Sequence, residues 1–356
     1  MTTRRRVLKY LAATATLTAG GVATLLPRRA NAYYAGPPTD HFNGAVFFNP
    51  GGGKPKSFRQ LAKLQLAESW ARWPSALESP YSDTPPAEHG DTSVRISFVG
   101  HASWLIQAAG LNILLDPVWS ERASPFAFAG PKRINAPGIA FDRLPRIDVV
   151  LVTHNHYDHL DLVTLGRLWQ RHKPRIVTPL GNDTIMRQEV ADLAAETVDW
   201  HQAVQLAPSV RVITEPTLHW SARGLRDRRH ALWASFVIET PAGRIYAVGD
   251  TGFGDGRLFR EIGARHGGFD LALLPIGAFE PRWFMRDHHM NPAEAVEAMA
   301  LSGAKIALAH HWGTFQLTAE PVLQPLDELE TALAAKGLAS DRFLAMRPGR
   351  VHVMGK

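Results

Sequence analysis

The sequence predicts a layered α/β fold with two sheets or one large mixed sheet. Short β-rich runs are closely spaced at first, as in an antiparallel meander, and alternate with helical patterns further along the chain. No short-period repeat interrupts them. With 45% hydrophobic and 20% charged residues, the composition is that of a globular protein that can bury a sizeable core, as one large domain or two smaller ones.

The predicted elements begin after an irregular N-terminal part, residues 33–92, which contains one helical pattern over 57–72. The following part, 93–356, is expected to form the main domain. Its strands are predicted at 94–99, 104–108, 111–115, 149–152, 176–178, 210–214, 232–238, 244–248, 271–275, 306–309 and 350–354. Its helices are predicted at 160–170, 184–195, 292–301 and 325–335. The helix at 292 has a clear start, because Asn291 can cap it, Pro292 suits the first turn and Glu294 can reach back.

The basic residues are unevenly distributed along the chain. There are 39 Lys+Arg and 33 Asp+Glu, which gives a formal net charge of +6. All of this excess lies in residues 1–32, where no acidic residue occurs; the basic residues there are Arg4, Arg5, Arg6, Lys9, Arg28 and Arg29. Residues 33–356 are therefore neutral by count, which argues against a nucleic-acid partner.

The same N-terminal stretch has the order of a signal peptide. A charged head is followed by an uncharged middle, 10–27, and by an A-x-A pattern at Ala30-Asn31-Ala32. The paired arginines resemble a twin-arginine (Tat) signal, so we expect residues 1–32 to direct export to the periplasm or beyond and to be removed. An uncleaved membrane anchor and a Sec signal are the alternatives.

Cysteine is absent, which excludes disulfides, thiolate metal sites and a cysteine nucleophile. No G-x-S-x-G occurs either, which weakens a serine-hydrolase interpretation. Any metal must therefore be held by carboxylates and by some of the sixteen histidines. Imidazole and carboxylate ligands suit zinc, with iron or manganese as alternatives.

Four side chains that can bind metal fall within six positions directly after an apolar strand, 149–152: His154, His156, Asp158 and His159. The first two are two residues apart and can share one side of an extended backbone. The turn of the chain points Asp158 and His159 in another direction, so the four side chains can bind two metal ions. A set of ordinary core or surface histidines, or a single structural metal, is the simpler alternative.

This H-x-H-x-D-H pattern after an apolar strand resembles the signature of the metallo-β-lactamase superfamily of hydrolases. The resemblance implies a four-layer αββα sandwich and three later ligands, which the chain supplies in order as His219, Asp250 and His311. It implies one metal held by His154, His156 and His219, a second held by Asp158, His159 and His311, and Asp250 as the bridge. His310 then has a structural or supporting role.

Longer strings resemble the branch of N-acylphosphatidylethanolamine-hydrolysing phospholipases D (NAPE-PLD), over about residues 40–326. They are Asp116–Ser120, Phe128–Arg133, His219–Arg223, Glu280–Met285 and His311–Phe315. In that branch a histidine just before the helix at Pro292 is linked to substrate phosphate and catalysis, which implies this role for His289. Its neighbour His288 stands where the branch usually has glutamine. Tyr157 and His288 are expected to line the substrate pocket.

The resemblance implies an exported di-zinc phosphodiesterase of phospholipase D type. Two cations lower the pKa of a water bound between them, so a metal-bridged hydroxide attacks phosphorus at ordinary pH. Asp158 and Asp250 take part in catalysis by holding the metals. The alternatives are a lactonase or other small-ester hydrolase, such as the ascorbate-6-phosphate lactonase branch, and a non-catalytic periplasmic metal-binding protein.

The implied substrate is a phospholipid or another phosphodiester. A lipid substrate implies peripheral membrane contact through apolar side chains, although aromatic residues more often lie in the core. The candidates are Phe47, Phe48, Trp70, Trp73, Phe126 and Phe128. The oligomeric state is left open by the sequence.

Overall fold

The computed structural model describes the chain except for residues 1–30, 53–55, 58, 61–62, 65–68 and 356. The predicted signal sequence therefore lies almost wholly outside the described residues. Residues 58, 61–62 and 65–68 of the helix expected at 57–72 also lie outside the described residues. Residues 59, 60, 63 and 64 are helical, and Leu64 is buried against Phe284 and Met285. Residues 57 and 69–72 are not helical, so the predicted bounds are too wide at both ends.

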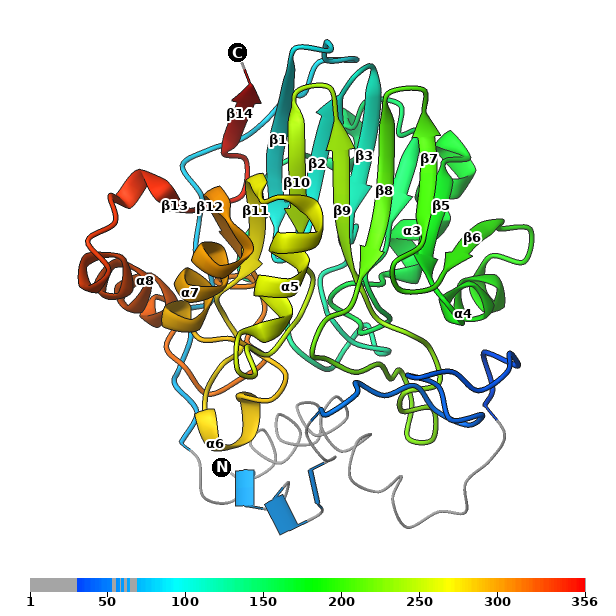
Figure 1. Ribbon diagram of the computed structural model, residues 1–356, viewed down its shortest axis with the longest axis horizontal. Helices are drawn as coiled ribbons and strands as arrows, with labels where there is room; N and C mark the ends of the chain where they lie inside the picture. The colour runs from blue at the N-terminus through cyan, green and yellow to red at the C-terminus, as the bar shows by residue number, and fades with distance from the viewer. Residues whose placement is uncertain (1–30, 53–55, 58, 61–62, 65–68, 356) are drawn as a thin grey trace.

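Within the described residues, the strands form two sheets of seven that face each other (Figure 1). The first sheet has the order β14-β1-β2-β3-β4-β5-β6 and the second the order β13-β12-β11-β10-β9-β8-β7. The first sheet contains β1 (Ser93–Gly100), β2 (Ser103–Ala108), β3 (Leu111–Leu115), β4 (Val149–Leu151), β5 (Arg175–Pro179), β6 (Ala195–Val198) and β14 (Val351–Gly355). The second contains β7 (Ala203–Ala207), β8 (Val210–Glu215), β9 (Ser235–Thr240), β10 (Gly243–Ala247), β11 (Phe269–Pro275), β12 (Ala304–His310) and β13 (Phe343–Ala345).

Helices cover the outer face of each sheet. The α-helices are α3 (Leu162–His172), α4 (Asn182–Glu189), α5 (Arg257–His266), α6 (Arg282–Met285), α7 (Pro292–Ser302) and α8 (Gln324–Ala335), and the short 3₁₀ turns are η2 (Phe141–Arg143) and η3 (Ser340–Arg342). Side chains of α3 and α4 pack on the first sheet, and side chains of α5, α7 and α8 pack on the second. Two sheets flanked by helices make the αββα sandwich that the sequence predicted.

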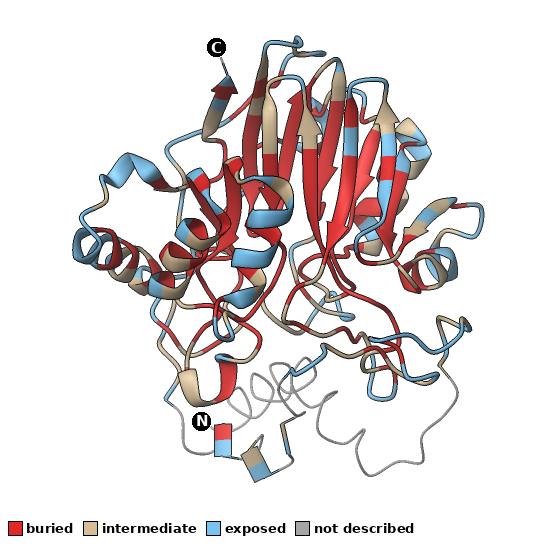
Figure 2. Ribbon diagram, viewed as in Figure 1, coloured by how far each residue is buried: buried red, intermediate tan, exposed pale blue. Residues whose placement is uncertain are grey.

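Alternation along the strands creates the layers. In β2, Trp104 and Ile106 face the other sheet, whereas Leu105 packs outward toward α3. In β11, Leu273 lies between the sheets and Leu274 lies under the helices of the second sheet. Both sheets are thus buried on two faces, as Figure 2 shows for most of their length. Strands of this kind read as continuous apolar runs, which is why the sequence revealed them.

Helix α7 begins as predicted. Asn291 accepts a hydrogen bond from the backbone N–H of Glu294, and the Glu294 carboxylate accepts one from the backbone of Asn291. Pro292 occupies the first turn. The capping box expected from the sequence is confirmed.

The helix predicted at 184–195 is wrong in its second half. Helix α4 ends at Glu189, and residues 195–198 form β6, which pairs in parallel with β5. A short edge strand of four residues has too few positions to show alternation. The elements β7, α5, α6 and β13 were likewise not predicted, and β9 begins three residues later than expected. No helix among the described residues is long and apolar enough to cross a membrane.

Candidate metal centre

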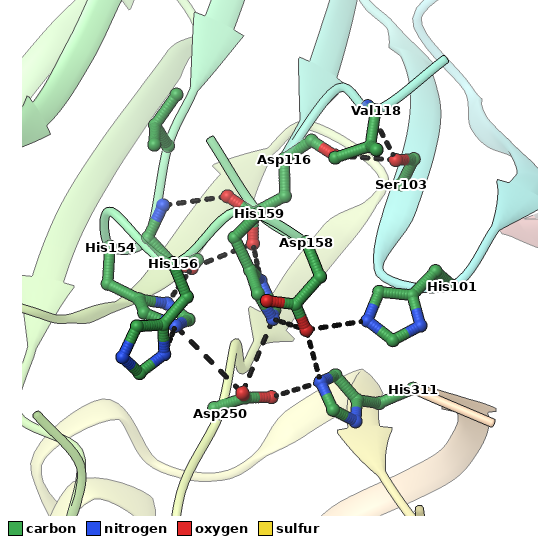
Figure 3. A network of polar contacts seen from close by, with 12 residues as sticks. His101, Ser103, Asp116, Val118, His154, His156, Asp158, His159, Asp250 and His311 are labelled. Carbon is green, nitrogen blue, oxygen red and sulfur yellow. Dashed lines mark hydrogen bonds and ion pairs between the residues drawn. The ribbon is translucent and has the colours of Figure 1, made fainter. Parts of the chain in front are cut away.

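The predicted ligands all follow the carboxyl ends of strands that run in the same direction within their sheet. Strands β3 and β4 are parallel neighbours in the first sheet, and β10, β11 and β12 are parallel neighbours in the second. The chain leaves each of these strands at the same edge of its sheet, where the anchored backbone lets side chains converge. Figure 3 shows the resulting cluster, which contains His154, His156, Asp158, His159, Asp250 and His311.

His154, His156 and His219 form the first donor set, together with Asp250. The Nδ1 atom of His156 lies 3.0 Å from Nε2 of His154 and 3.2 Å from Nε2 of His219. Oδ2 of Asp250 lies 3.6 Å from Nε2 of His219 and 3.9 Å from that of His154. These four donor atoms lie within 4.8 Å of one another.

Asp158, His159 and His311 form the second donor set. Oδ2 of Asp158 lies 3.2 Å from Nε2 of His311 and 3.6 Å from Nε2 of His159. His101 joins this set, because its Nε2 lies 2.9 Å from the same carboxylate oxygen. All four side chains are buried.

Asp250 lies between the two sets. Its Oδ1 faces His311 at 3.0 Å, and its Oδ2 faces His159 at 3.3 Å as well as the histidines of the first set. A carboxylate has two oxygens to offer, whereas an imidazole has one free lone pair. The side chain has the position that a bridging ligand requires.

His311, rather than His310, belongs to the cluster. His310 ends β12, and its Nε2 donates to the carbonyl of Val248 at 2.8 Å. His311 has a φ of 63°, a left-handed conformation that turns the chain at the end of the strand. Its backbone N–H donates to the carbonyl of His101 over 2.7 Å.

Asp116 holds the loop of the H-x-H-x-D-H motif from behind. Its Oδ2 accepts a hydrogen bond from Nδ1 of His159 at 2.8 Å, and its two oxygens accept from the backbone and hydroxyl of Thr153, each at 2.7 Å. The bond from Nδ1 leaves Nε2 of His159 as the atom that faces the cluster. Such partners fix the tautomer and the orientation of a metal-binding imidazole.

In the metal-free protein the pKa values of the histidines differ between the two donor sets. Burial lowers the pKa of His156 to about 4, and it lowers the pKa of His154 and of His219 well below the ordinary value. These imidazoles are therefore neutral at neutral pH, as metal ligands must be. Burial alone would also lower the pKa of His311, but Asp250 and Asp158 outweigh it and raise that pKa to about 9.

The donor sets fit a metal ion. Zinc–nitrogen bonds of 2.0–2.1 Å in a tetrahedron put neighbouring ligand atoms roughly 3.3 Å apart. In the first set three neutral imidazoles direct nitrogens at one another at 3.0–3.2 Å, although a proton can bridge only two of them at a time. In the second set the cationic imidazoles of His311 and His159 lie next to the carboxylates of Asp158 and Asp250. A bound cation resolves both arrangements.

The three residues predicted to contact substrate lie around this cluster. Nε2 of His289 lies 4.0 Å from Oδ2 of Asp250, and its ring packs edge-on against His219. The backbone carbonyl of His288 accepts a hydrogen bond from Nδ1 of His219. Tyr157 is half-buried, and its hydroxyl donates to the carbonyl of Arg223 at 2.9 Å.

The sequence interpretation missed three residues of the site. His101 follows β1 directly, and His154 follows β4 after two residues, so a position at a strand end was the available signal. Asp116 follows β3 in the same way. Arg223 gave no such signal: its guanidinium donates to the carbonyls of Asn155 and Leu160, at the two ends of the motif loop, and lies over the Tyr157 ring.

A small pocket lies beside His311. Its walls are mostly apolar, and one comes from the N-terminal part of the chain. The lining residues are Trp73, Ala278, His311, Trp312, Gly313, Phe315, Leu317, Thr318, Glu320 and Pro325.

The sandwich and the His/Asp cluster at its edge define the class of this protein. Residues 111–312 match the beta-lactamase superfamily domain, and the chain belongs to the metallo-β-lactamase superfamily of metal-dependent hydrolases. The fold is shared with an isothiocyanate hydrolase from Delia radicum gut bacteria, with a TM-score of 0.59 and 17% identity, covering 74% of this chain and all of that one.

Within the superfamily, the chain belongs to the NAPE-PLD-like branch. It is 36% identical over 332 residues to N-acyl-phosphatidylethanolamine-hydrolyzing phospholipase D 1 of Caenorhabditis elegans, covering 87% of this chain and 92% of that protein. It is also 36% identical over 261 residues to the mitochondrial enzyme of the same name from Saccharomyces cerevisiae, covering 70% of this chain and 55% of that protein.

Proposed function

We propose that this protein is an exported di-zinc phosphodiesterase of phospholipase D type that acts on N-acylphosphatidylethanolamine-like phospholipids. The observation that carries the proposal is the position of Asp250 between two complete donor sets. The named activity of the C. elegans relative supports the substrate class. Hydrolysis of the phosphodiester on the headgroup side releases an N-acylethanolamine and phosphatidic acid.

In this proposal His154, His156 and His219 hold one ion, Asp158, His159 and His311 hold the other, and Asp250 bridges them. Iron and manganese are the alternatives to zinc for such ligands. The two ions would lower the pKa of bound water and withdraw charge from phosphoryl oxygens. The protein contributes rigidity, because the ligands lie in a buried cluster anchored at strand ends.

His289 is proposed to orient the phosphate. Burial lowers its pKa to about 4, so the ring is neutral and can donate one N–H to a phosphoryl oxygen. Its Nδ1 has no hydrogen-bond partner among the described residues. An anion beside the ring favours the protonated form, so substrate binding raises this pKa toward the range in which His289 can protonate a leaving alkoxide.

The loop after Asp116 supplies apolar surface for lipid. Phe126 is 47% exposed and Phe128 is 81% exposed, and their rings pair at 5.6 Å. The guanidinium of Arg122 donates to the carbonyls of Ala127 and Gly130 and holds this loop in shape. Phe47, by contrast, is fully buried in a core cluster, so its candidacy as a membrane contact is wrong. We propose that the phenyl pair contacts the membrane.

The experiment that tests the function compares four substrates on the mature chain, residues 33–356, after its metal content has been measured. They are N-acylphosphatidylethanolamine, an ordinary phospholipid, a soluble phosphodiester and a lactone. The proposal expects two metal ions per chain and fastest turnover of the first substrate. Turnover of the lactone alone would instead support the small-ester hydrolase alternative, and metal binding without turnover would support a non-catalytic role.

Membrane contact and export need separate tests. Phe128→Ser should weaken binding to liposomes while leaving turnover of the soluble phosphodiester intact, and Val353→Ser is a control because Val353 is also exposed but lies on β14. For export, Arg4→Lys, Arg5→Lys and Arg6→Lys together should retain the protein in the cytoplasm. A periplasmic product whose first residue is Tyr33 would support cleavage after Ala32, and a cytoplasmic wild type would contradict the export proposal.

A further inference from the structure

The loop that follows His219 folds back on itself beside the metal centre. The backbone N–H of Arg229 donates to the carbonyl of Ser221 at 2.7 Å, and this bond closes the loop. Arg229 has a φ of 62°, and its carbonyl accepts from Phe47 of the N-terminal part at 2.8 Å. This bond brings Arg228 and Arg229, at the end of the loop, close to Trp220 at its start.

Trp220 lies between Arg228 and His156 of the metal cluster. Its indole packs edge-on against His156, with ring centroids 4.6 Å apart, and Arg228 lies over the indole at 4.4 Å from the centroid. The guanidinium therefore belongs to the immediate surroundings of the first donor set.

His288 lies against the other side of this group. Its ring centroid is 6.3 Å from that of Trp220 and 6.0 Å from that of His219. The side chain is only 8% exposed, yet neither ring nitrogen has a hydrogen-bond partner among the described residues. Nε of Arg229 is also buried without such a partner. Buried polar atoms of this kind usually have a ligand, ion or water as partner.

The charge around His288 is predominantly positive. Arg228 lies over the indole of Trp220, and the His288 ring packs against the same indole. The nearby carboxylate of Asp287 is paired with Lys56 at 2.6 Å. Arginines close to an imidazole whose ring nitrogens lack partners suit a carboxylate or phosphate, because a guanidinium can donate two parallel hydrogen bonds to either group.

We propose that Trp220, Arg228, Arg229 and His288 form a second anion subsite, which takes a carboxylate or phosphate carried by the substrate in addition to the phosphodiester at the metal centre. This inference rests on the phosphodiesterase function proposed above. It assigns to the enzyme a preference for phospholipids whose headgroup bears a further negative charge.

Two pairs of soluble short-chain phospholipids test the subsite on the zinc-loaded protein. The first pair is an N-butanoylphosphatidylserine and the corresponding N-butanoylphosphatidylethanolamine, which differ by one carboxylate. The second pair is phosphatidylglycerol phosphate and phosphatidylglycerol, which differ by one phosphate. A KM lower by about tenfold or more for the anionic member of either pair is expected, as for hydrogen bonds to a charged group. The pair that shows the difference identifies the anion.

Three single variants and one double variant locate the effect. Arg228→Gln and Arg229→Gln should each reduce the KM ratio within the pair, with the larger loss when both are combined. Arg226→Gln removes the same charge from the same loop, but Arg226 is exposed two residues away, so the ratio should remain. Zinc content and circular dichroism verify that each variant is folded.

Equal KM values for both members of both pairs in the wild type would overturn the inference, as would a preference that survives the double variant. Calorimetric binding of the same pairs keeps the two proposals distinguishable. If no phospholipid is cleaved but the anionic members bind more tightly through Arg228, the phosphodiesterase proposal fails and the subsite stands. If all four phospholipids are cleaved with equal KM, the phosphodiesterase proposal stands and the subsite fails.

Discussion

His101 donates a hydrogen bond from Nε2 to Oδ2 of Asp158 over 2.9 Å, and both side chains are buried at the edge of the sandwich. Burial lowers the pKa of His101 to about 3, so the ring is neutral and carries a single proton. That proton lies on the nitrogen that faces the carboxylate. The imidazole thus orients a carboxylate oxygen that also faces His159 and His311.

Replacing His101 by glutamine should weaken the second metal site. Loss of a partner that orients a metal ligand typically lowers metal affinity about 10–100-fold. Zinc competition with a chelator measures this affinity directly. His172→Gln, at the C-terminal end of α3 outside both donor sets, serves as the control and should bind zinc as the wild type does. Unchanged zinc affinity in His101→Gln would contradict a positioning role.

Asp250→Asn should reduce bound zinc from two ions per chain to one or fewer. The amide keeps the shape of the side chain but removes the negative charge shared by the two donor sets. Elemental analysis of the purified variant gives the count, and turnover of a phosphodiester should fall with it. Less than one ion in the wild type, with no change in the variant, would disprove the assigned centre.

The stability of the metal-free protein should fall between pH 7 and pH 9.5. The carboxylates overcome burial and raise the pKa of His311 to about 9, and they raise the pKa of His159 well above its ordinary value. A raised pKa means that the folded state binds the proton more tightly than the unfolded state does. The stabilisation is complete below the unfolded pKa of about 6.5 and is lost as pH rises through the folded pKa.

Melting temperatures of the EDTA-treated protein across this pH range test the point. Because a metal ion must displace these protons, zinc affinity should rise over the same interval, and the zinc-loaded protein should lack the loss of stability that the metal-free protein shows. A metal-free protein equally stable at pH 7 and pH 9.5 would show that the two imidazoles are not protonated in the cluster.

Glu215→Gln should destabilise the fold without affecting metal binding. This buried carboxylate at the end of β8 contacts Arg265 at 2.5 Å and His266 at 2.8 Å, and so ties α5 to the second sheet. His266 is buried whereas Arg265 is nearly half exposed, so removing the carboxylate charge should cost about 1–3 kcal/mol. Glu239→Gln is the control, because its pair with Arg211 is largely exposed and such pairs contribute about 1 kcal/mol or less. Urea unfolding of both variants, with zinc content, tests the difference.

The strands with buried residues on both faces were predictable, since their apolar runs stand out from the surrounding sequence. Strands β1 to β4, β8, β10 and β12 were found this way, and so was α7 through its capping box. Strands β6, β7 and β13 lie at the edges of their sheets and are three to five residues long. Their conformation depends on a neighbouring strand that local sequence does not reveal.

The candidate ligands were predictable for a different reason. Four of them are adjacent in one loop, and each of the others directly follows an apolar strand or lies in a short motif that resembles the superfamily. His101 and Asp116 each follow a strand directly but belong to no run of metal-binding residues. Only Asp116 lies in a string that resembles the NAPE-PLD branch. Arg223 acts through backbone carbonyls 63 and 68 residues away, a relationship that only the folded chain creates.

Apolar periodicity and residue chemistry are local properties, so the sequence by itself determined a layered α/β fold and the kinds of ligand. Its resemblance to the superfamily supplied the αββα sandwich and the order of the later ligands. The sequence also confined the excess charge to the first 32 residues, since counting requires no structure. The tertiary structure decided which atoms meet: Asp250 between two donor sets, His101 behind Asp158, and two arginines returned to Trp220. These contacts join segments from two sheets. Their distances are set by the packing of strands that are distant in the sequence, and not by the neighbouring residues in the chain.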